Sequence, residues 1–251
     1  MLRLPSLTIL IPTYARTALL AEAIASALAQ DYRGDYSIVV FNDCARQFLT
    51  CPDSRVAIVN STERCSSLGA KRDKMLWLDV GRYVVWLDDD DLLMPWHLSN
   101  LARWIRPGPE LTGAVLCRTL IRYHLNQWSW GPTPGGINGI LVETAFAKAI
   151  GGFDRSLDVG EDNAFRAKLL ERPKVLAYAP IPSYVYRVDA PTLHISQSLR
   201  GTTVDPSLFT KAAAARMDSG EEPTGNVVIT PWMQADYQQE FRKRFPLDCP
   251  S

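Results

Sequence analysis

The sequence has no surplus charge and no long apolar run. Lys plus Arg and Asp plus Glu both number 27 among 251 residues, which argues against a protein drawn as a whole to nucleic acid or to anionic membranes. No apolar run is long enough to cross a bilayer, and Pro5 and Pro12 interrupt the N-terminal region where a signal peptide needs an unbroken apolar centre. We therefore expect a cytoplasmic protein without a transmembrane segment.

The cysteines also lack the pattern of a disulfide or zinc framework. They are odd in number, have no C-x-x-C spacing and lie in otherwise core-like segments: Cys44, Cys51, Cys65, Cys117 and Cys249. Reduced thiols are the simpler interpretation. Hydrophobic residues make up 47% of the chain, enough for a substantial core, so we expect one large domain with a modest appendage.

Strand-like and helical patterns alternate in the first hundred residues. The apolar, β-branched runs predict strands at 6–14, 37–43, 55–60 and 82–89, and helical spacing of apolar residues predicts helices at 15–30 and 66–81. Continuous apolar strands between helices are typical of a mostly parallel sheet that is covered on both faces. The predicted fold class is therefore α/β, of the Rossmann-like, doubly wound type.

The pattern is looser in the second half. We expect one or two strands in 113–125, an aromatic, Gly/Pro-rich loop at 127–139, helices at 140–153 and 161–172, and strand-like segments in 175–188. The residues after 200 are rich in Gly, Pro, Ser and Thr and predict a loosely attached tail with one short helix. This gives a domain over 1–200 and an extension over 201–251.

Four consecutive aspartates, Asp88 to Asp91, follow the last apolar strand of the first half. In an open parallel sheet, ligands bind at the carboxyl ends of the strands, so these carboxylates are expected in the binding crevice. They repel one another unless a cation or hydrogen-bond donors neutralise them, and clustered oxygens suit Mg²⁺ or Mn²⁺. The alternative is that they are solvated or cap a helix that starts near Pro95, and Asp91 is the candidate cap.

Six segments together resemble glycosyltransferase family 2, which has the GT-A fold. They are IPTYAR (11–16), VVFND (39–43), LGAKRDKML (68–76), WLDDDDLLMP (86–95), GGFDRSLDVGED (151–162) and YRVDAPTLH (186–194), in the order and spacing of that family, across about residues 6–200. The resemblance implies a nucleoside-diphosphate sugar donor, Mn²⁺ or Mg²⁺, and inversion at the anomeric carbon. It also divides the domain into a nucleotide-sugar half, about 1–100, and an acceptor half, about 101–200.

The resemblance assigns the donor and metal site position by position. The pocket for base and ribose is implied at Pro12, Thr13, Tyr14 and Asp43; Arg72, with Lys71 as the fallback, is implied on the diphosphate. Asp88 and Asp90 resemble the D-x-D pair, with Asp90 the direct metal ligand and Asp88 or Asp89 nearer the ribose or donor sugar. His194 matches a late histidine that completes the metal site or touches the diphosphate, although a lone histidine is often structural.

On the acceptor side, the resemblance identifies Asp162 as the catalytic base, with Glu161 beside it helping to position the site. From the residues alone, the two are also acceptable as acids in the first turn of a helix. Trp128 and Trp130 are candidates for acceptor contact or for the core. His97 and His124 are interpreted as structural.

Departures from the family pattern and the open acceptor limit the functional hypothesis. Ala15, Asn42 and Asp73 stand where the family often has Asn, Asp and Asn, and the Q-x-x-R-W sequence of processive members is absent, so we expect transfer of a single sugar. Asp43 suits uracil, which favours UDP-sugars. The acceptor remains open among a glycan, a lipid-linked glycan, a protein, a small molecule and a modified nucleobase. The alternatives are a nucleotidyltransferase of related fold and a catalytically inactive nucleotide-sugar-binding module.

Overall fold

A seven-stranded sheet forms the centre of the computed structural model, which describes residues 4–106, 113–124, 127–132, 136–173, 176–187, 224–231 and 236–244. From one edge to the other the strands are β11 (Leu176–Ala179), β7 (Ala114–Cys117), β10 (Ile140–Glu143), β5 (Tyr83–Trp86), β1 (Leu7–Thr13), β2 (Tyr36–Asn42) and β4 (Val56–Asn60). β10 is antiparallel to β5 and β7, and the other neighbouring pairs are parallel. The expected α/β, mostly parallel sheet is confirmed.

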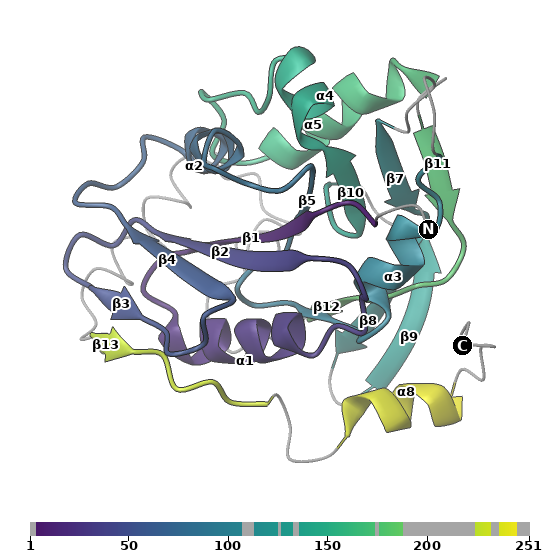
Figure 1. Cartoon of the computed structure of the whole chain (residues 1–251), viewed down its shortest axis with the longest axis horizontal. Coiled ribbons are helices and arrows are strands. Elements are labelled where there is room, and N and C mark those ends of the chain that lie inside the picture. Colours follow the sequence, from purple (N-terminus) through teal and green to yellow (C-terminus); the bar gives the residue numbers. More distant parts are fainter. Residues whose placement is uncertain are drawn as a thin grey trace, which may run out of the picture.

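Helices cover both faces of this sheet (Figure 1). α1 (Thr17–Leu28) and α3 (His97–Ala102) lie on one face. α2 (Leu68–Leu76), α4 (Thr144–Ala149) and α5 (Glu161–Leu170) lie on the other. A separate apolar core fills each of the two spaces between sheet and helices.

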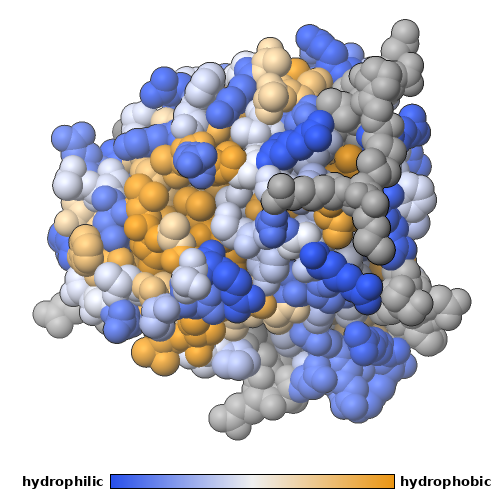
Figure 2. Space-filling model, in the orientation of Figure 1, coloured by the Kyte–Doolittle hydropathy of each residue, from blue (hydrophilic) through white to orange (hydrophobic). Residues whose placement is uncertain are grey.

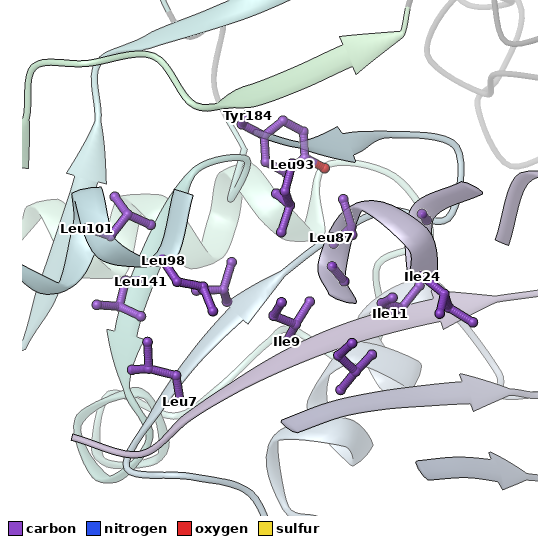
Figure 3. Packing of buried hydrophobic residues seen from close by; sticks show 14 of the residues in the cluster. Leu7, Ile9, Ile11, Ile24, Leu87, Leu93, Leu98, Leu101, Leu141 and Tyr184 are labelled. Atoms are coloured by element: carbon purple, nitrogen blue, oxygen red, sulfur yellow. The ribbon is translucent and has the colours of Figure 1, made fainter. Parts of the chain in front are cut away.

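The side chains of β1 show how the sequence builds these two cores. All positions of this strand are buried, and Leu7, Ile9 and Ile11 point into the core shared with α1, whereas Leu10 points into the other. Figure 3 shows Ile11 beside Ile24 of α1. Because successive side chains of a strand point to opposite faces, only a sheet covered on both sides can bury such a run completely.

A second, four-stranded sheet follows the aspartates. Its order is β6 (Leu92–Leu93), β12 (Tyr184–Arg187), β8 (Thr119–His124) and β9 (Gln127–Pro132). The C-terminal helix α8 (Tyr237–Arg244) packs on it through a third apolar cluster. A short pair, β3 (Leu49–Thr50) with β13 (Gly225–Asn226), attaches another part of the extension to the domain. These described parts of the extension are therefore packed rather than loosely attached.

Two expected elements differ from the structure. The segment 127–132 is strand β9 and not a loop, because antiparallel pairing with β8 supplies hydrogen-bond partners that its glycine and proline content does not reveal. The segment 140–153 begins with strand β10 before it turns into α4, since Ile140 to Val142 complete the sheet between β5 and β7. Within the described residues, no helix is both long and apolar enough to span a bilayer.

The outer surface is mixed in character. On the face shown in Figure 2, polar and charged side chains surround an apolar area over the β2–β4 side of the sheet.

The cysteines Cys44, Cys51, Cys65 and Cys117 are free thiols, as expected, and Cys249 lies outside the described residues.

Candidate functional site

The carboxyl ends of three neighbouring parallel strands bring the predicted donor residues together. β1 ends at Thr13, Asp43 directly follows β2, and the aspartate loop Asp88–Asp91 follows β5. The N-terminus of α5, with Glu161 and Asp162 in its first turn, faces the same edge of the sheet. This is the position at which open α/β sheets bind ligands.

Each of the four carboxylates of the aspartate loop has hydrogen-bond donors around it, and Asp89 and Asp90 share Arg16. Asp89 is fully buried and accepts a hydrogen bond from Thr13 Oγ1 at 2.7 Å and two from the guanidinium of Arg16. Arg16 Nη1 also donates to Asp90 Oδ2 at 2.9 Å. Burial raises the pKa of Asp89 to about 6, and the charge of Arg16 opposes this rise.

Asp91 is not a helix cap. Its carboxylate accepts hydrogen bonds from the phenol of Tyr184 at 2.9 Å, from the backbone N–H of Arg187 at 2.9 Å and from Asn138 at 3.3 Å. Helix α3 starts at His97, and Trp96 occupies its N-cap position. Burial raises the pKa of Asp91 well above its ordinary value. Asp91 therefore ties the aspartate loop to β12, and the expectation of a cap was wrong.

Arg72 lies between Asp88 and the start of α5. Its Nη2 donates to Asp88 Oδ1 at 2.7 Å and its Nε lies 3.1 Å from Glu161 Oε1, while only 4% of the side chain is exposed. Nη1 is buried and makes no hydrogen bond with a described residue, and the diphosphate contact predicted from the sequence stays a prediction. Burial raises the pKa of Glu161 to about 7, although the positive charge of Arg72 lowers it.

The predicted nucleotide pocket contains a second buried ion pair. Lys71 Nζ lies 2.5 Å from Asp43 Oδ1 and donates to the backbone oxygen of Thr13 at 3.1 Å. Asp43 Oδ2 accepts from the backbone N–H of Cys65. Tyr14 is half-buried, and the guanidinium of Arg64 lies over its ring at 4.5 Å from the centroid. One face of this tyrosine is therefore covered by protein.

Asp162 is half-buried in the first turn of α5 and contacts the turn at residues 136–139. Its Oδ1 accepts from the backbone N–H of Asn163, whose own side chain accepts from Gly136 N at 2.9 Å. Gly136 has φ of +72°, and a Cβ at this position would collide with the Asp162 carboxylate. The turn therefore limits the positions that this carboxylate can take.

Of the aromatic and histidine candidates, some belong to the core and one is exposed. Trp128 packs parallel to Tyr237 of α8, with ring centroids 6.3 Å apart, so it belongs to the cluster that holds that helix. Trp130 is 43% exposed and remains a candidate for contact with the acceptor substrate. His97 is structural as expected, because it is fully buried, contacts Ser183, and has its pKa lowered to about 3 by burial. His194 and the side chain of His124 lie outside the described residues.

The described residues suit a metal ion that is held together with a phosphate ligand. In the described part of the chain, no three His, Cys, Asp or Glu side chains are grouped to hold a metal. The oxygens of Asp90 and Asp88 are nevertheless hard ligands of the right kind, because Mg²⁺ is usually held by one or two carboxylates plus substrate phosphates. The donor set thus suits a divalent ion that completes its coordination with a diphosphate.

Sequence reasoning assigned no role to Arg16, Tyr184 or Arg187. Arg187 Nε donates to the backbone oxygen of Asp90, and its Nη1 lies 2.5 Å from Glu22 Oε2. The run of four aspartates was the one feature of the sequence that indicates such partners, because buried charges need groups of opposite charge or hydrogen-bond donors beside them. The sequence does not indicate which cations supply them.

Comparison with known proteins identifies the family of this chain. A model of the family described as Glycosyl transferase family 2 matches residues 8–156. The "Putative colanic acid biosynthesis glycosyl transferase WcaA" of Escherichia coli (strain K12) is 31% identical over 102 residues, which are 38% of this chain and 36% of that protein. An "Uncharacterized glycosyltransferase" of Haemophilus influenzae (strain ATCC 51907 / DSM 11121 / KW20 / Rd) is 24% identical over 196 residues, 68% of this chain and 64% of that protein. The chain thus spans less than two thirds of either relative.

Solved structures show the same fold. Staphylococcal TarS (S. aureus, residues 1–349) in complex with UDP-GlcNAc has a TM-score of 0.61 at 16% identity, covering 84% of this chain and 65% of that one. The mannosyltransferase PcManGT from Pyrobaculum calidifontis, in complex with GDP-Man and Mn²⁺, has a TM-score of 0.55 at 21% identity, with coverages of 86% and 70%. They confirm the expected GT-A-type fold. Since the family model matches more than half of its residues, the chain belongs to glycosyltransferase family 2.

Proposed function

We propose that this protein transfers one sugar from a nucleoside-diphosphate sugar to an acceptor hydroxyl, with inversion at the anomeric carbon. The observation that carries the proposal is the buried connection Asp88–Arg72–Glu161. It joins the aspartate loop, the proposed donor side, to the first turn of α5, which holds the proposed base Asp162. Direct displacement needs these two groups on opposite sides of one reacting carbon, held in fixed relation.

The donor is proposed to bind in the half that comprises about residues 1–100. Pro12 and Thr13 end β1, Tyr14 follows the strand, and Asp43 lies beside them. A carboxylate suits the imide N–H of uracil, and TarS, a structural neighbour, is described in complex with UDP-GlcNAc, so UDP-sugars are the first choice. PcManGT in complex with GDP-Man makes guanosine donors the second.

Asp90, with Asp88, is proposed to hold Mn²⁺ or Mg²⁺ against the donor diphosphate, and His194 is a further candidate ligand. When bound, the ion neutralises negative charge on the leaving nucleoside diphosphate. The neighbour PcManGT is described with Mn²⁺, which supports a divalent ion. Asp89 stays buried against Thr13 and Arg16 and shapes the loop that presents Asp90.

Asp162 is proposed to remove the proton of the acceptor hydroxyl as the new bond forms. It is half-buried, so it can meet an acceptor that enters from solvent, and it lies at a helix N-terminus, where a negative charge is favoured. Glu161 beside it is turned to Arg72 and fixes the helix start rather than facing solvent. Trp130 is the exposed aromatic candidate for acceptor contact, and the class of acceptor stays open.

The first test is a thermal-shift panel of UDP, GDP and dTDP, each with and without Mn²⁺. A ligand that binds only the folded state raises the melting temperature, so one nucleotide that needs Mn²⁺ is expected to give a clear shift. No shift with any nucleoside diphosphate contradicts the proposal.

The second test is turnover of the nucleotide sugar so identified. Asp162→Asn is expected to keep the thermal shift and to lose about a hundredfold or more in kcat, the usual scale for a general base. Asp53→Asn, at a half-buried carboxylate that pairs with the exposed Arg55, is the matched control and should leave turnover unchanged. Normal turnover by Asp162→Asn overturns the assignment of the base.

A further inference from the structure

Arg16 places a fixed positive charge on the carboxylate that is proposed to hold the metal. It follows β1 and stands at the N-cap position of α1, directly after Ala15, whose φ is +49°. Its guanidinium reaches across to the aspartate loop, where Nη1 donates to Asp90 Oδ2 at 2.9 Å. Its side chain is largely buried, with 18% exposed.

Asp89 anchors this guanidinium. Nε and Nη2 of Arg16 both donate to the Asp89 carboxylate, which is fully buried and also accepts from Thr13. Two parallel bonds to one carboxylate fix a guanidinium firmly. The Asp90 backbone is held separately, by Arg187 Nε. Arg16 can therefore give up Asp90 Oδ2 without leaving Asp89 and without release of the loop.

We propose that Arg16 is a resident counter-cation of the aspartate loop: it occupies Asp90 Oδ2 while the donor is absent and yields this oxygen when a divalent ion arrives with the donor diphosphate. The inference rests on the proposed function in taking Asp90 as the metal ligand. A monovalent cation fixed beside Asp90 repels a bare divalent ion. The negative diphosphate offsets that repulsion, so ion and donor load together rather than in sequence.

A purely structural role for Arg16 makes the opposite prediction. If the guanidinium only holds the loop in shape, its removal frees the carboxylates to move and weakens or leaves unchanged the binding of a metal. If it competes for Asp90, its removal strengthens binding. The sign of the change in affinity for Mn²⁺ alone therefore separates the two roles.

The experiment is a titration of the full chain with Mn²⁺ alone, without nucleotide, in which the free ion is measured by electron paramagnetic resonance. Arg16→Gln is expected to bind Mn²⁺ about tenfold more tightly or better than the unchanged protein. Arg16→Lys, which keeps the charge, should stay near the original affinity, and Arg55→Gln at a remote exposed pair should not change it. Adding Asp90→Asn to Arg16→Gln should abolish the gain. Equal or weaker binding by Arg16→Gln overturns the inference.

A second variant tests whether a change in Mn²⁺ binding comes from a folding defect. Arg16→Gln leaves Asp89 buried without its cation, so the double variant Arg16→Gln/Asp89→Asn removes both charges and keeps Asp90. It should unfold in a cooperative thermal transition and bind Mn²⁺ about tenfold more tightly than Asp89→Asn alone, which lacks the same negative charge but keeps Arg16. No such difference between these folded variants also overturns the inference. The titration uses no donor, so failure here with normal sugar transfer would disprove the role of Arg16 alone, whereas absent transfer would disprove the proposed function.

Discussion

Arg72 Nη2 donates to Asp88 Oδ1 at 2.7 Å from a side chain that is only 4% exposed. A guanidinium so deeply buried is retained only if carboxylates surround it, and Glu161 supplies the second one. The family resemblance placed Arg72 on the diphosphate of the donor. The structure gives it a second task, because the aspartate loop and the first turn of α5 are connected through it.

Replacing Arg72 with Gln should therefore damage both stability and turnover. Removal of one partner from a buried ion pair costs about 3 kcal/mol, because it leaves the other charges uncompensated. We expect a lower free energy of unfolding in urea and, under conditions where the variant is folded, a lower kcat. Arg55→Gln breaks an exposed pair and should change stability by less than about 1 kcal/mol. Equal effects of the two variants would contradict the connecting role of Arg72.

Gly136→Ala should impair catalysis through Asp162. The new Cβ would collide with the Asp162 carboxylate at a backbone φ of +72°. We expect a kcat decrease of about tenfold or more, since small displacements of a catalytic group are costly, with the donor thermal shift retained. Gly151→Ala is the matched control, because its φ is +85° but its nearest contact is an ordinary 3.9 Å to Lys168 Nζ. Similar losses of kcat in both variants would show backbone strain rather than contact with Asp162.

The strands and the position of the site could be predicted because their signals are local. The run from Tyr83 to Leu87 is apolar without interruption, and the aspartates follow it directly. Partners that fold back from distant positions could not be predicted. Asp91 is satisfied by Tyr184, 93 positions away. Arg16 contacts Asp89, 73 positions away, and follows a left-handed residue, Ala15, that nothing in the sequence requires.

Segment 127–132 illustrates the limit for secondary structure. Its tryptophans favour a strand, but its neighbouring glycines and prolines favour a loop, and local preference alone does not decide. Pairing with β8 decides, and α8 then covers Trp128 with Tyr237 and Phe241. Helix α8 of the extension thus covers the four-stranded sheet through apolar contacts, which the polar composition of the extension concealed.

Helix α8 should consequently contribute to the stability of the whole domain. Phe241 is 1% exposed and packs against Trp96 and Trp128. Phe241→Ala is expected to lower the free energy of unfolding by about 3 kcal/mol or more, as for other buried aromatic residues. Tyr237→Phe removes a hydrogen bond of 3.0 Å to the backbone oxygen of Leu93 and should cost about 1 kcal/mol.

The control for α8 is Lys243→Ala, at a side chain that is 60% exposed. It should leave the urea midpoint nearly unchanged. If Phe241→Ala has the midpoint of the original protein, α8 does not belong to the cooperative unit.

The raised pKa of Glu161 should make the free energy of unfolding depend on pH. Burial raises its folded pKa from 4.5 to about 7, so the folded state keeps a proton that the unfolded state loses between these values. Stability from this group is therefore fully present below about pH 4.5 and falls as the pH rises to about 7, by roughly 3 kcal/mol at most.

Glu161→Gln cannot titrate and should remove this contribution to the slope. We expect the difference in free energy of unfolding, Glu161→Gln minus the original protein, to increase from pH 4.5 to pH 7 and then to stay constant, as measured by urea unfolding at each pH. Other titrating groups, such as Asp89, are common to both proteins and largely cancel in the difference. Glu63→Gln, at an exposed glutamate, controls for the amide replacement and should give a flat difference. Parallel pH profiles for Glu161→Gln and the original protein would mean that Glu161 is already ionised at pH 5, with Arg72 outweighing burial.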